Sequence, residues 1–191
     1  EALEAYENGI ELDPDNAEAW FNKAWILGEL NRYQEAIDAY DKVLEIDDEH
    51  ADTMFNKAHI LEGQGKYEEA VKCYDKLSMI DPENPAPIFN KGAILVLKLG
   101  AYPEAIKCFD RTLELIPDDY FSLHYRGISL RKNGELQEAL DSFDKALKVD
   151  ENEVITVIDK GDTYKEMGNT EKAMECYDKA LKLVKKSFYG D

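Results

Sequence analysis

Basic residues are scarce in this sequence. Its 191 residues include 23 lysines and arginines against 41 aspartates and glutamates, which gives a net charge of −18. A surface with this balance repels a phosphate backbone, and no basic stripe runs along the chain, so we do not expect nucleic acid as a partner. Adhesion to an anionic membrane is disfavoured for the same reason. We expect a well-solvated acidic surface, whose field would favour basic partners.

Long apolar segments are also missing. The longest apolar run is Ala93–Leu97 and it ends at Lys98, whereas a membrane span needs about 18 apolar residues. The first residues have neither a basic start nor an apolar core, so no signal peptide is recognised. Three cysteines are too few for a disulfide scaffold and fit a reducing compartment, which predicts a cytoplasmic protein.

The sequence also lacks the motifs of common active sites. His50, His59 and His124 are never four residues apart, so they form no zincin-type pair. No phosphate-binding glycine loop and no Gly-x-Ser-x-Gly motif occurs. We therefore expect no catalytic residues, no metal site and no cofactor, and hence not an enzyme.

An internal repeat dominates what the sequence does contain. An alanine followed four residues later by an aromatic residue recurs every 34 residues, with one interval of 35. The pairs are Ala2 and Tyr6, Ala36 and Tyr40, Ala70 and Tyr74, Ala105 and Phe109, Ala139 and Phe143, and Ala173 and Tyr177. A second small position carries Ala24, Ala58, Gly92, Gly127 and Gly161. So many coincidences at one period indicate a repeat architecture.

Each repeat is predicted to form two antiparallel helices. In the first complete repeat, the first helix runs from Ala17 to about Leu30 and follows acidic and asparagine residues that suit a helix N-terminus. The second helix runs from about Tyr33 to Ile46. The turn between them should be left-handed, since glycine or asparagine stands there in every repeat. These turn residues are Asn31, Gly65, Gly100, Gly134 and Gly168.

This pattern resembles the tetratricopeptide repeat, which reads Trp-x2-Leu-Gly-x2-Tyr, then Ala-x3-Phe, then Pro. The matching residues are Trp20, Ala24, Leu27, Ala36, Tyr40, Pro14, Pro82 and Pro117. The resemblance implies an all-α fold, a right-handed α-solenoid of antiparallel helix hairpins. It implies a single array over residues 1–187, with a half repeat at 1–16, repeats at 17–50, 51–84, 85–119, 120–153 and 154–187, and a tail at 188–191.

The cysteines are explained by the repeat. Cys73, Cys108 and Cys176 share one repeat position with Ala39 and Ser142, where a small residue is needed. Equivalent positions of neighbouring repeats should lie at least about 8–10 Å apart, which is too far for a disulfide. We therefore interpret these cysteines as packing residues.

One departure from the family pattern occurs in every repeat. A basic residue replaces the usual leucine of the first helix, and an aspartate stands near the middle of the second helix. The basic residues are Lys23, Lys57, Lys91, Arg126 and Lys160, and the aspartates are Asp41, Asp75, Asp110, Asp144 and Asp178. We expect an ion pair within a hairpin or between adjacent hairpins in at least three of the five repeats. Separately solvated charges are the alternative.

A second departure is confined to repeat 85–119. It has one extra residue between Leu95 and Tyr102, which predicts a longer first helix, a π-bulge or a looser turn. Val96, Leu97 and Leu99 fall on helix faces that should contact solvent. They indicate either an apolar interaction surface or packing that compensates for the inserted residue. Pro103 should occupy the first turn of the following helix, where its missing N–H is harmless.

The resemblance also implies where a partner binds, because first helices of this family line a concave groove. The partner-binding residues predicted on this basis are Phe21, Asn22, Trp25, Phe55, Asn56, His59, Phe89, Asn90, Leu97, Arg131 and Lys132. The three asparagines resemble the ladder with which family members hold an extended peptide backbone, unless they bond locally. The phenylalanines stand where chaperone-tail readers need a lysine, which argues against that ligand. Arg131 and Lys132 should form the only basic spot along that face.

These features predict a scaffold or adaptor module that binds a protein or peptide. The alternatives are a regulatory or targeting segment of a larger enzyme, or an array that self-associates through its ends. The last helix, around Met174 to Val184, keeps apolar residues where a further repeat would stack. We expect the Ser187-Phe188-Tyr189 tail or another molecule to cover them.

Overall fold

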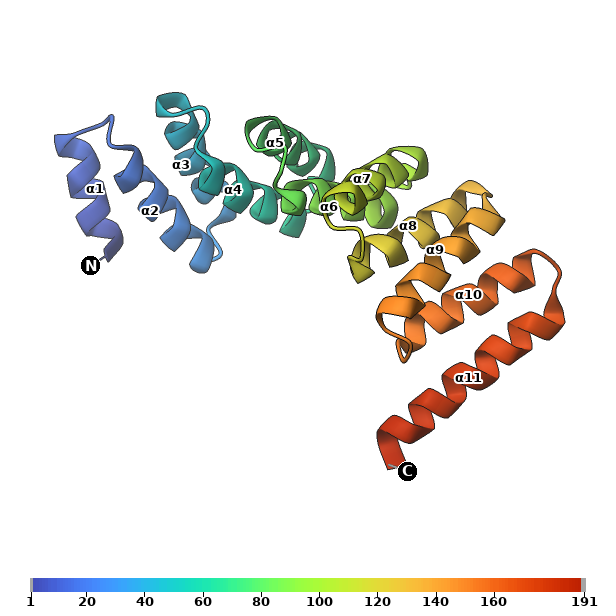
Figure 1. The fold of residues 1–191 in the computed structure, drawn as a ribbon. Helices are drawn as coiled ribbons and strands as arrows, with labels where there is room; N and C mark the ends of the chain where they lie inside the picture. Colours follow the sequence, from blue (N-terminus) through green and yellow to red (C-terminus); the bar gives the residue numbers. More distant parts are fainter. Residues whose placement is uncertain (1, 190–191) are drawn as a thin grey trace. The chain divides into compact units, whose positions relative to one another are not determined.

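The structure is a computed structural model that describes the backbone of residues 2–189 (Figure 1). Over that range the chain forms eleven α-helices and one short π-helix, without any strand. The fold is an all-α solenoid of antiparallel helix hairpins, as the repeat predicted. None of the described helices combines the length and the apolar character needed to cross a membrane.

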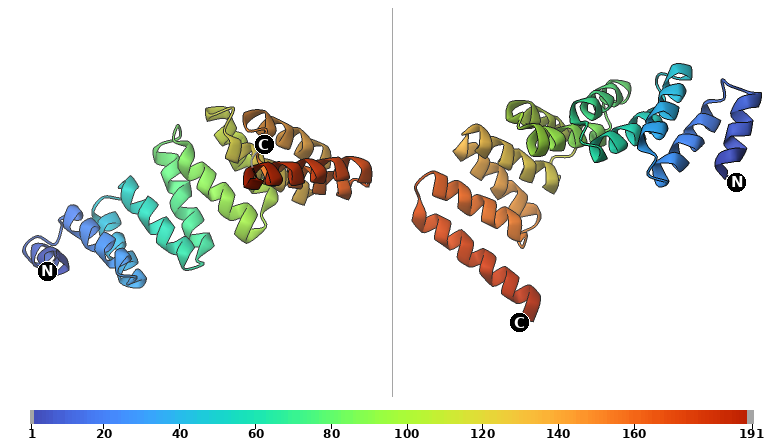
Figure 2. Two further views of the ribbon diagram at one scale, coloured as in Figure 1. Left: turned by 90° about the horizontal axis from the view of Figure 1, so that it is seen from below. Right: turned by 180° about the vertical axis from the view of Figure 1, so that it is seen from behind.

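The chain divides into two compact units, the N-terminal unit at residues 1–87 and the C-terminal unit at residues 88–191. The N-terminal unit contains α1 (Ala2–Leu12), α2 (Ala17–Glu29), α3 (Tyr33–Ile46), α4 (Ala51–Gly63) and α5 (Tyr67–Ile80). Helix α6 (Pro85–Ile94) includes the boundary. The C-terminal unit continues with η1 (Leu95–Leu99), α7 (Tyr102–Leu115), α8 (Tyr120–Asn133), α9 (Leu136–Val149), α10 (Val154–Glu166) and α11 (Thr170–Tyr189). Figure 2 shows the antiparallel hairpins of each unit from two further directions.

The hairpin turns have the predicted left-handed backbone. The φ angle is 59° at Asn31 and lies between 64° and 88° at Gly65, Gly100, Gly134 and Gly168. In the first hairpin the Arg32 N–H donates to the carbonyl of Leu27 at 2.9 Å, which closes the end of α2. The start of α2 is capped as expected, since the Asn16 side chain accepts a hydrogen bond from the Ala19 N–H at 2.9 Å.

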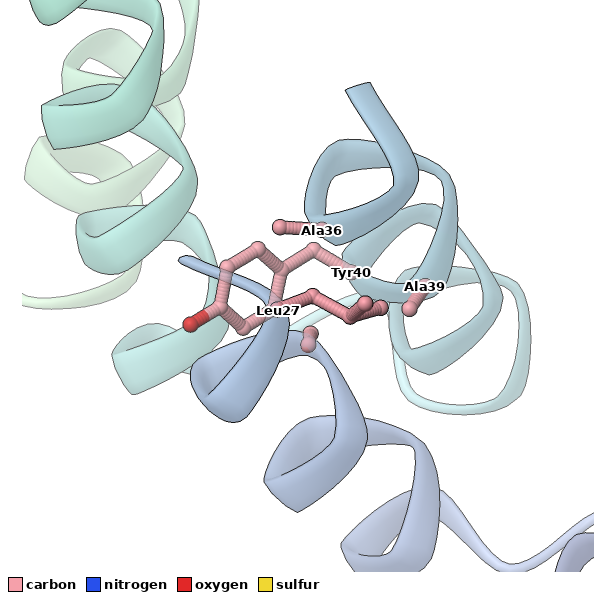
Figure 3. Close-up of a cluster of buried hydrophobic side chains, with 5 residues drawn as sticks. Leu27, Ala36, Ala39 and Tyr40 are labelled. Atoms are coloured by element: carbon pink, nitrogen blue, oxygen red, sulfur yellow. The ribbon is translucent and has the colours of Figure 1, made fainter. Parts of the chain in front are cut away.

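One aromatic ring is buried in the middle of each complete hairpin except the last. Tyr40, Tyr74, Phe109 and Phe143 are each at most 1% exposed. Figure 3 shows the Tyr40 ring beside Leu27, with Ala36 and Ala39 on the same helix as the tyrosine. Small residues at these positions allow the helix axes to approach closely enough for the ring to fill the remaining space.

The small residue of the first helix is alanine in the N-terminal unit and glycine in the C-terminal unit. A Cβ added at Gly127 would lie 2.5 Å from the Cε1 atom of Phe143, and one at Gly161 would lie 2.8 Å from the Tyr177 ring. Both distances are too short for real contacts. The C-terminal hairpins therefore pack more closely at this crossing, and only glycine fits there.

The predicted ion pairs form, and they connect neighbouring repeats. Lys57 pairs with Asp41, Arg126 with Asp110 and Lys160 with Asp144, each 16 residues earlier on the second helix of the preceding repeat. Lys23 pairs in the same way with Glu7 at 3.1 Å. The aspartates of these pairs are 47–48% exposed, so each pair contributes about 0.3–1 kcal/mol.

The extra residue of repeat 85–119 is accommodated by a π-helix, one of the three predicted outcomes. Helix α6 continues into η1, and Gly100 ends it with φ 64°. The Ala101 N–H donates to the carbonyl of Leu95, six residues earlier, at 2.9 Å. The equivalent hydrogen bond of the first hairpin, from Arg32 to Leu27, joins residues only five apart. The expectation that Val96 contacts solvent is wrong: it is 7% exposed, because the wider turn brings it into the core beside Leu95.

The last helix leaves several apolar side chains exposed, as predicted. Met174 is 60% exposed, Leu181 52% and Val184 36%. The backbone continues as helix through Tyr189, so residues 187–189 do not fold back over the helix to which they belong. The side chains of Phe188 and Tyr189 lie outside the described residues. The expectation that this tail or another molecule covers the exposed residues stays a prediction.

We expect the Gly127→Ala substitution to destabilise the protein by about 1–2 kcal/mol. The added methyl group overpacks the Phe143 ring, a penalty of about 1–3 kcal/mol, while the gain in helix propensity returns at most about 1 kcal/mol. Gly9→Ala is the matched control, because nothing lies within 4 Å of its added Cβ. The midpoint of urea unfolding, followed by circular dichroism, measures both. Equal midpoints for the two variants would show that the crossing is not tightly packed.

Candidate functional site

Three of the predicted binding residues gather at one hollow in the N-terminal unit. Trp25 from α2 and Asn56 and His59 from α4 line a depression of about 470 Å³. Helices α2 and α4 are the first helices of neighbouring repeats and contact each other. The hollow therefore lies along first helices, where the family resemblance predicts a binding face.

Aromatic side chains give this face its apolar character, to different degrees. The indole of Trp25 is 53% exposed. Phe21 and Phe55 are half-buried, with Phe21 packed 5.9 Å from the Tyr40 ring and Phe55 packed 6.0 Å from Tyr74. The phenylalanines are thus held by the core with part of each ring exposed, whereas Trp25 is available as a contact residue.

The asparagine ladder stays a prediction. Asn56 and Tyr40 both line the hollow. Burial raises the pKa of Tyr40 to about 12, and the nearby Asn56 amide opposes that rise. Asn22 and Asn90 are half-buried. An amide has both donor and acceptor groups, so Asn56 keeps hydrogen-bonding capacity for a ligand.

Among the predicted residues of the C-terminal unit, exposure varies widely. Phe89 is half-buried, with its ring 5.8 Å from Phe109 and 5.9 Å from Tyr125. Leu97 in η1 is 53% exposed, and Lys132 on α8 is exposed. Leu97 and Lys132 are therefore accessible to a partner, whereas Phe89 packs against its own repeat and the next one.

The prediction that Arg131 offers a free basic group is wrong. Its side chain is only 10% exposed and pairs with Asp159 at 3.0 Å, Asp162 at 3.3 Å and Glu166 at 3.6 Å. All three carboxylates belong to α10, so the guanidinium joins α8 to the first helix of the next repeat. Its charge is already neutralised, and its buried Nε has no hydrogen-bond partner among the described residues.

A chain of polar groups extends this ion-pair network. The His124 Nδ1 lies 2.8 Å from the Thr156 hydroxyl, which lies 2.5 Å from the Tyr120 hydroxyl. The His124 Nε2 is 3.7 Å from Asp159. Burial lowers the pKa of His124 and raises that of Asp159. Sequence reasoning missed this network. The spacing of Asp159 and Asp162, three residues apart on one helix face, could have indicated an acidic pair that needs a basic partner.

The cysteines occupy the small-residue position that the repeat predicts. Cys108 is buried, and Cys73 and Cys176 are half-buried. Burial raises the pKa of the Cys73 and Cys176 thiols, which lowers their reactivity. Within the described residues, no group of His, Cys, Asp and Glu side chains could hold a metal ion.

We expect Arg131→Met to destabilise the C-terminal unit by about 2–4 kcal/mol, because it leaves the largely buried Asp159 without its partner. Lys132→Met, an exposed neighbour, is the control and should change stability by less than about 0.5 kcal/mol. Because burial already raises the pKa of Asp159, protonation should relieve the defect as the pH falls. Urea unfolding of both variants measures this, and similar losses would contradict the role of the network.

We expect His124 to make stability fall as the solution is acidified. Its pKa in the folded protein is below the ordinary value of 6.5, so the unfolded chain binds the proton first, and stability is lost as the pH falls through about 6.5. His124→Phe removes this contribution and introduces the residue that Phe21 and Phe55 supply at the same repeat position. Thermal unfolding at several pH values compares the two proteins. Parallel curves would contradict the prediction.

Comparison with known proteins agrees with the fold. The tetratricopeptide repeat family matches residues 1–51, 29–90, 120–153 and 157–185. Among curated proteins, no match to the sequence is found.

Solved structures are also similar to this chain. YrrB, described as a tetratricopeptide repeat protein with an unusual peptide-binding site, is 29% identical, with a TM-score of 0.79 over 95% of this chain and 93% of its own. MamA is 19% identical, with a TM-score of 0.83 over 91% of this chain and 94% of its own. A repeat protein from Parabacteroides merdae is 21% identical, with a TM-score of 0.73 over 94% of this chain and 71% of its own.

The family matches agree with the 34-residue period, the left-handed hairpin turns and the buried rings. The chain belongs to the tetratricopeptide repeat family.

Proposed function

We propose that this chain is a protein-interaction scaffold that binds an extended peptide or protein segment along its first helices. The observation that carries the proposal is the hollow between α2 and α4, where the exposed Trp25 meets Asn56 and His59. An aromatic anchor beside polar groups is the usual composition of a binding hot spot. The likeness to YrrB, described as having a peptide-binding site, supports the same class of function.

The hollow has the chemistry to hold a peptide without reading much of its sequence. Trp25 offers a large apolar surface at a low entropic penalty. The Asn56 amide is half-buried in the hollow that Tyr40 also lines, so less side-chain freedom is lost when a peptide group bonds to it. Asn22, at the same repeat position on α2, is half-buried and lies outside the residues that line the hollow. Two amides at one repeat position match the donor and acceptor groups of an extended backbone.

Charge restricts the partner further. The chain carries a net charge of −18, and Arg131 is occupied by three carboxylates. Lys132 is the remaining predicted basic residue, and it is exposed. A basic or neutral segment therefore suits this protein better than an acidic one, because an acidic segment would meet repulsion.

A second candidate function is self-association, favoured by the exposed apolar residues of α11. Met174 and Leu181 are more than half exposed. Single exposed apolar residues are common on protein surfaces, but several on one helix favour an interface. Light scattering at two concentrations separates this function from peptide binding. A mass that equals that of the monomer at both concentrations would eliminate it.

We expect Trp25→Ala to weaken peptide binding at least about tenfold, since a buried aromatic anchor contributes about 2 kcal/mol or more. Asn56→Ala should weaken it about fivefold, close to the 1 kcal/mol net value of one hydrogen bond. The probe is a set of fluorescein-labelled peptides selected from a random display library on the wild-type chain, and anisotropy measures the affinities.

Met79→Ala is the matched control for these variants. Met79 is 78% exposed on α5 and is not among the residues that line the hollow. The affinity of the Met79→Ala variant for the selected peptides should equal that of the wild type. Circular dichroism should show that all three variants are folded. Selected peptides that bind folded Trp25→Ala as tightly as the wild type would show that this hollow is not the binding site.

A further inference from the structure

The C-terminal unit contains a separate hollow of about 510 Å³. It lies where the start of α8, the end of α9 and the start of α10 meet, and Phe121, Val149 and Ile155 are among the residues that line it. It shares no residue with the hollow of the N-terminal unit. None of its lining residues was predicted to bind a partner.

The apolar residues of this hollow are more exposed than packing would require. Phe121 is 59% exposed, Ile155 61% and Val149 46%. Phe121 and Ile155 occupy the second position of their repeats, where the N-terminal unit has the exposed acidic residues Glu18 and Asp52. The fold therefore does not need an apolar side chain at this position. Two large apolar side chains kept at an exposed position indicate a contact surface.

Aromatic rings form the floor between them. The Tyr120 ring stacks on His124 with centroids 5.9 Å apart and planes at 12°, and Phe121 contacts Tyr120 edge-on at 5.3 Å. Tyr120 and His124 both hydrogen-bond Thr156, so the floor is fixed to α10. A floor held in this way loses little freedom when a ligand binds. Aromatic faces also attract cationic side chains.

Two carboxylates stand at the edge of the hollow. Asp150 follows α9 and Glu153 precedes α10, and both line the hollow. At the start of α2 and of α8 the equivalent side chains, Asn16 and Asp119, cap the helix, whereas Glu153 makes no capping hydrogen bond. No lysine or arginine lines this hollow. The edge is therefore acidic and lacks a neutralising residue of its own.

We propose that this hollow is a docking surface for a basic segment of another protein. The segment would place one bulky apolar side chain between Phe121 and Ile155 and an arginine or lysine beside Asp150 and Glu153. The charge complementarity selects this occupant, because an acidic segment would meet two carboxylates. The surface goes beyond peptide binding by α2 and α4, and it can fail or succeed independently of that function.

The test uses the full 191-residue chain and a defined probe, a short fluorescein-labelled peptide with two Arg-Phe pairs framed by Gly and Ser. The double variant Phe121→Glu, Ile155→Asp introduces the types of residue that the first two repeats carry at this position, so it should fold. We expect it to bind the probe about tenfold more weakly in anisotropy, although its added negative charge would by itself attract the basic peptide. Asp150→Asn, Glu153→Gln should also weaken binding and reduce its salt dependence.

Matched peptides and a second variant complete the design. Peptides with Glu in place of Arg, or Ala in place of Phe, should bind much more weakly than the probe, and Trp25→Ala should bind the probe as the wild type does. The proposal is overturned if the wild type does not bind the probe or if the Phe121→Glu, Ile155→Asp variant binds it equally well. It is also overturned if Trp25→Ala abolishes binding, which would place the peptide in the N-terminal unit. Light scattering compares the oligomeric states. If the wild type is a dimer and the Phe121→Glu, Ile155→Asp variant is a monomer, the proposal is overturned too, because the occupant is then a second copy of the chain.

Discussion

The burial of an aromatic ring against small residues at the helix crossing is the interaction on which this structure depends. Each of Tyr40, Tyr74, Phe109 and Phe143 is almost completely buried, and burial of one such side chain removes about 150–250 Å² from water. A helix hairpin alone has no core, so these contacts hold its helices together. The crossing permits alanine on α2 and α4, but the closer approach at Gly127 permits only glycine.

The first and second helices of each repeat have different packing roles, which leaves side chains of the first helices free to bind a partner. The second helices supply the buried rings and the aspartates of the inter-repeat ion pairs. On the first helices, the small residue and the basic residue meet these partners, which leaves other positions unconstrained by packing. Trp25 is one such position and Phe121 is another, and both are more than half exposed. Repeats with the same core can therefore carry different surfaces.

Electrostatics differ between two positions that look alike in the sequence. Lys132 and Arg131 are neighbours on α8, yet one is exposed and the other is nearly buried among three carboxylates of α10. The buried guanidinium holds two repeats together, and its charge is not available to a partner. Beside it, His124 stands at the repeat position of Phe21 and Phe55 and bonds Thr156, which fixes the aromatic floor of the C-terminal hollow.

The amino-acid sequence by itself determined the repeat period and the hairpin turns, and it indicated the ion pairs without deciding whether they join helices of one hairpin or of two. Each of these depends on residue types at fixed spacing, such as glycine or asparagine at a left-handed turn, so one chain read in register predicts them. The extra residue before Tyr102 was visible too. Its accommodation as a π-helix was not, because three local solutions were available and the burial of Leu95 and Val96 distinguishes them.

Only the tertiary structure decided which polar and apolar side chains are available. Arg131 meets Asp159 and Asp162 across a repeat boundary, and Asn56 meets Tyr40 from the preceding hairpin. Phe121 and Ile155 reach one hollow although they are a whole repeat apart in the sequence. Periodicity places a residue on a helix face, but whether a side chain is exposed or paired depends on what the adjacent repeat presents to it, and that is settled by packing in three dimensions.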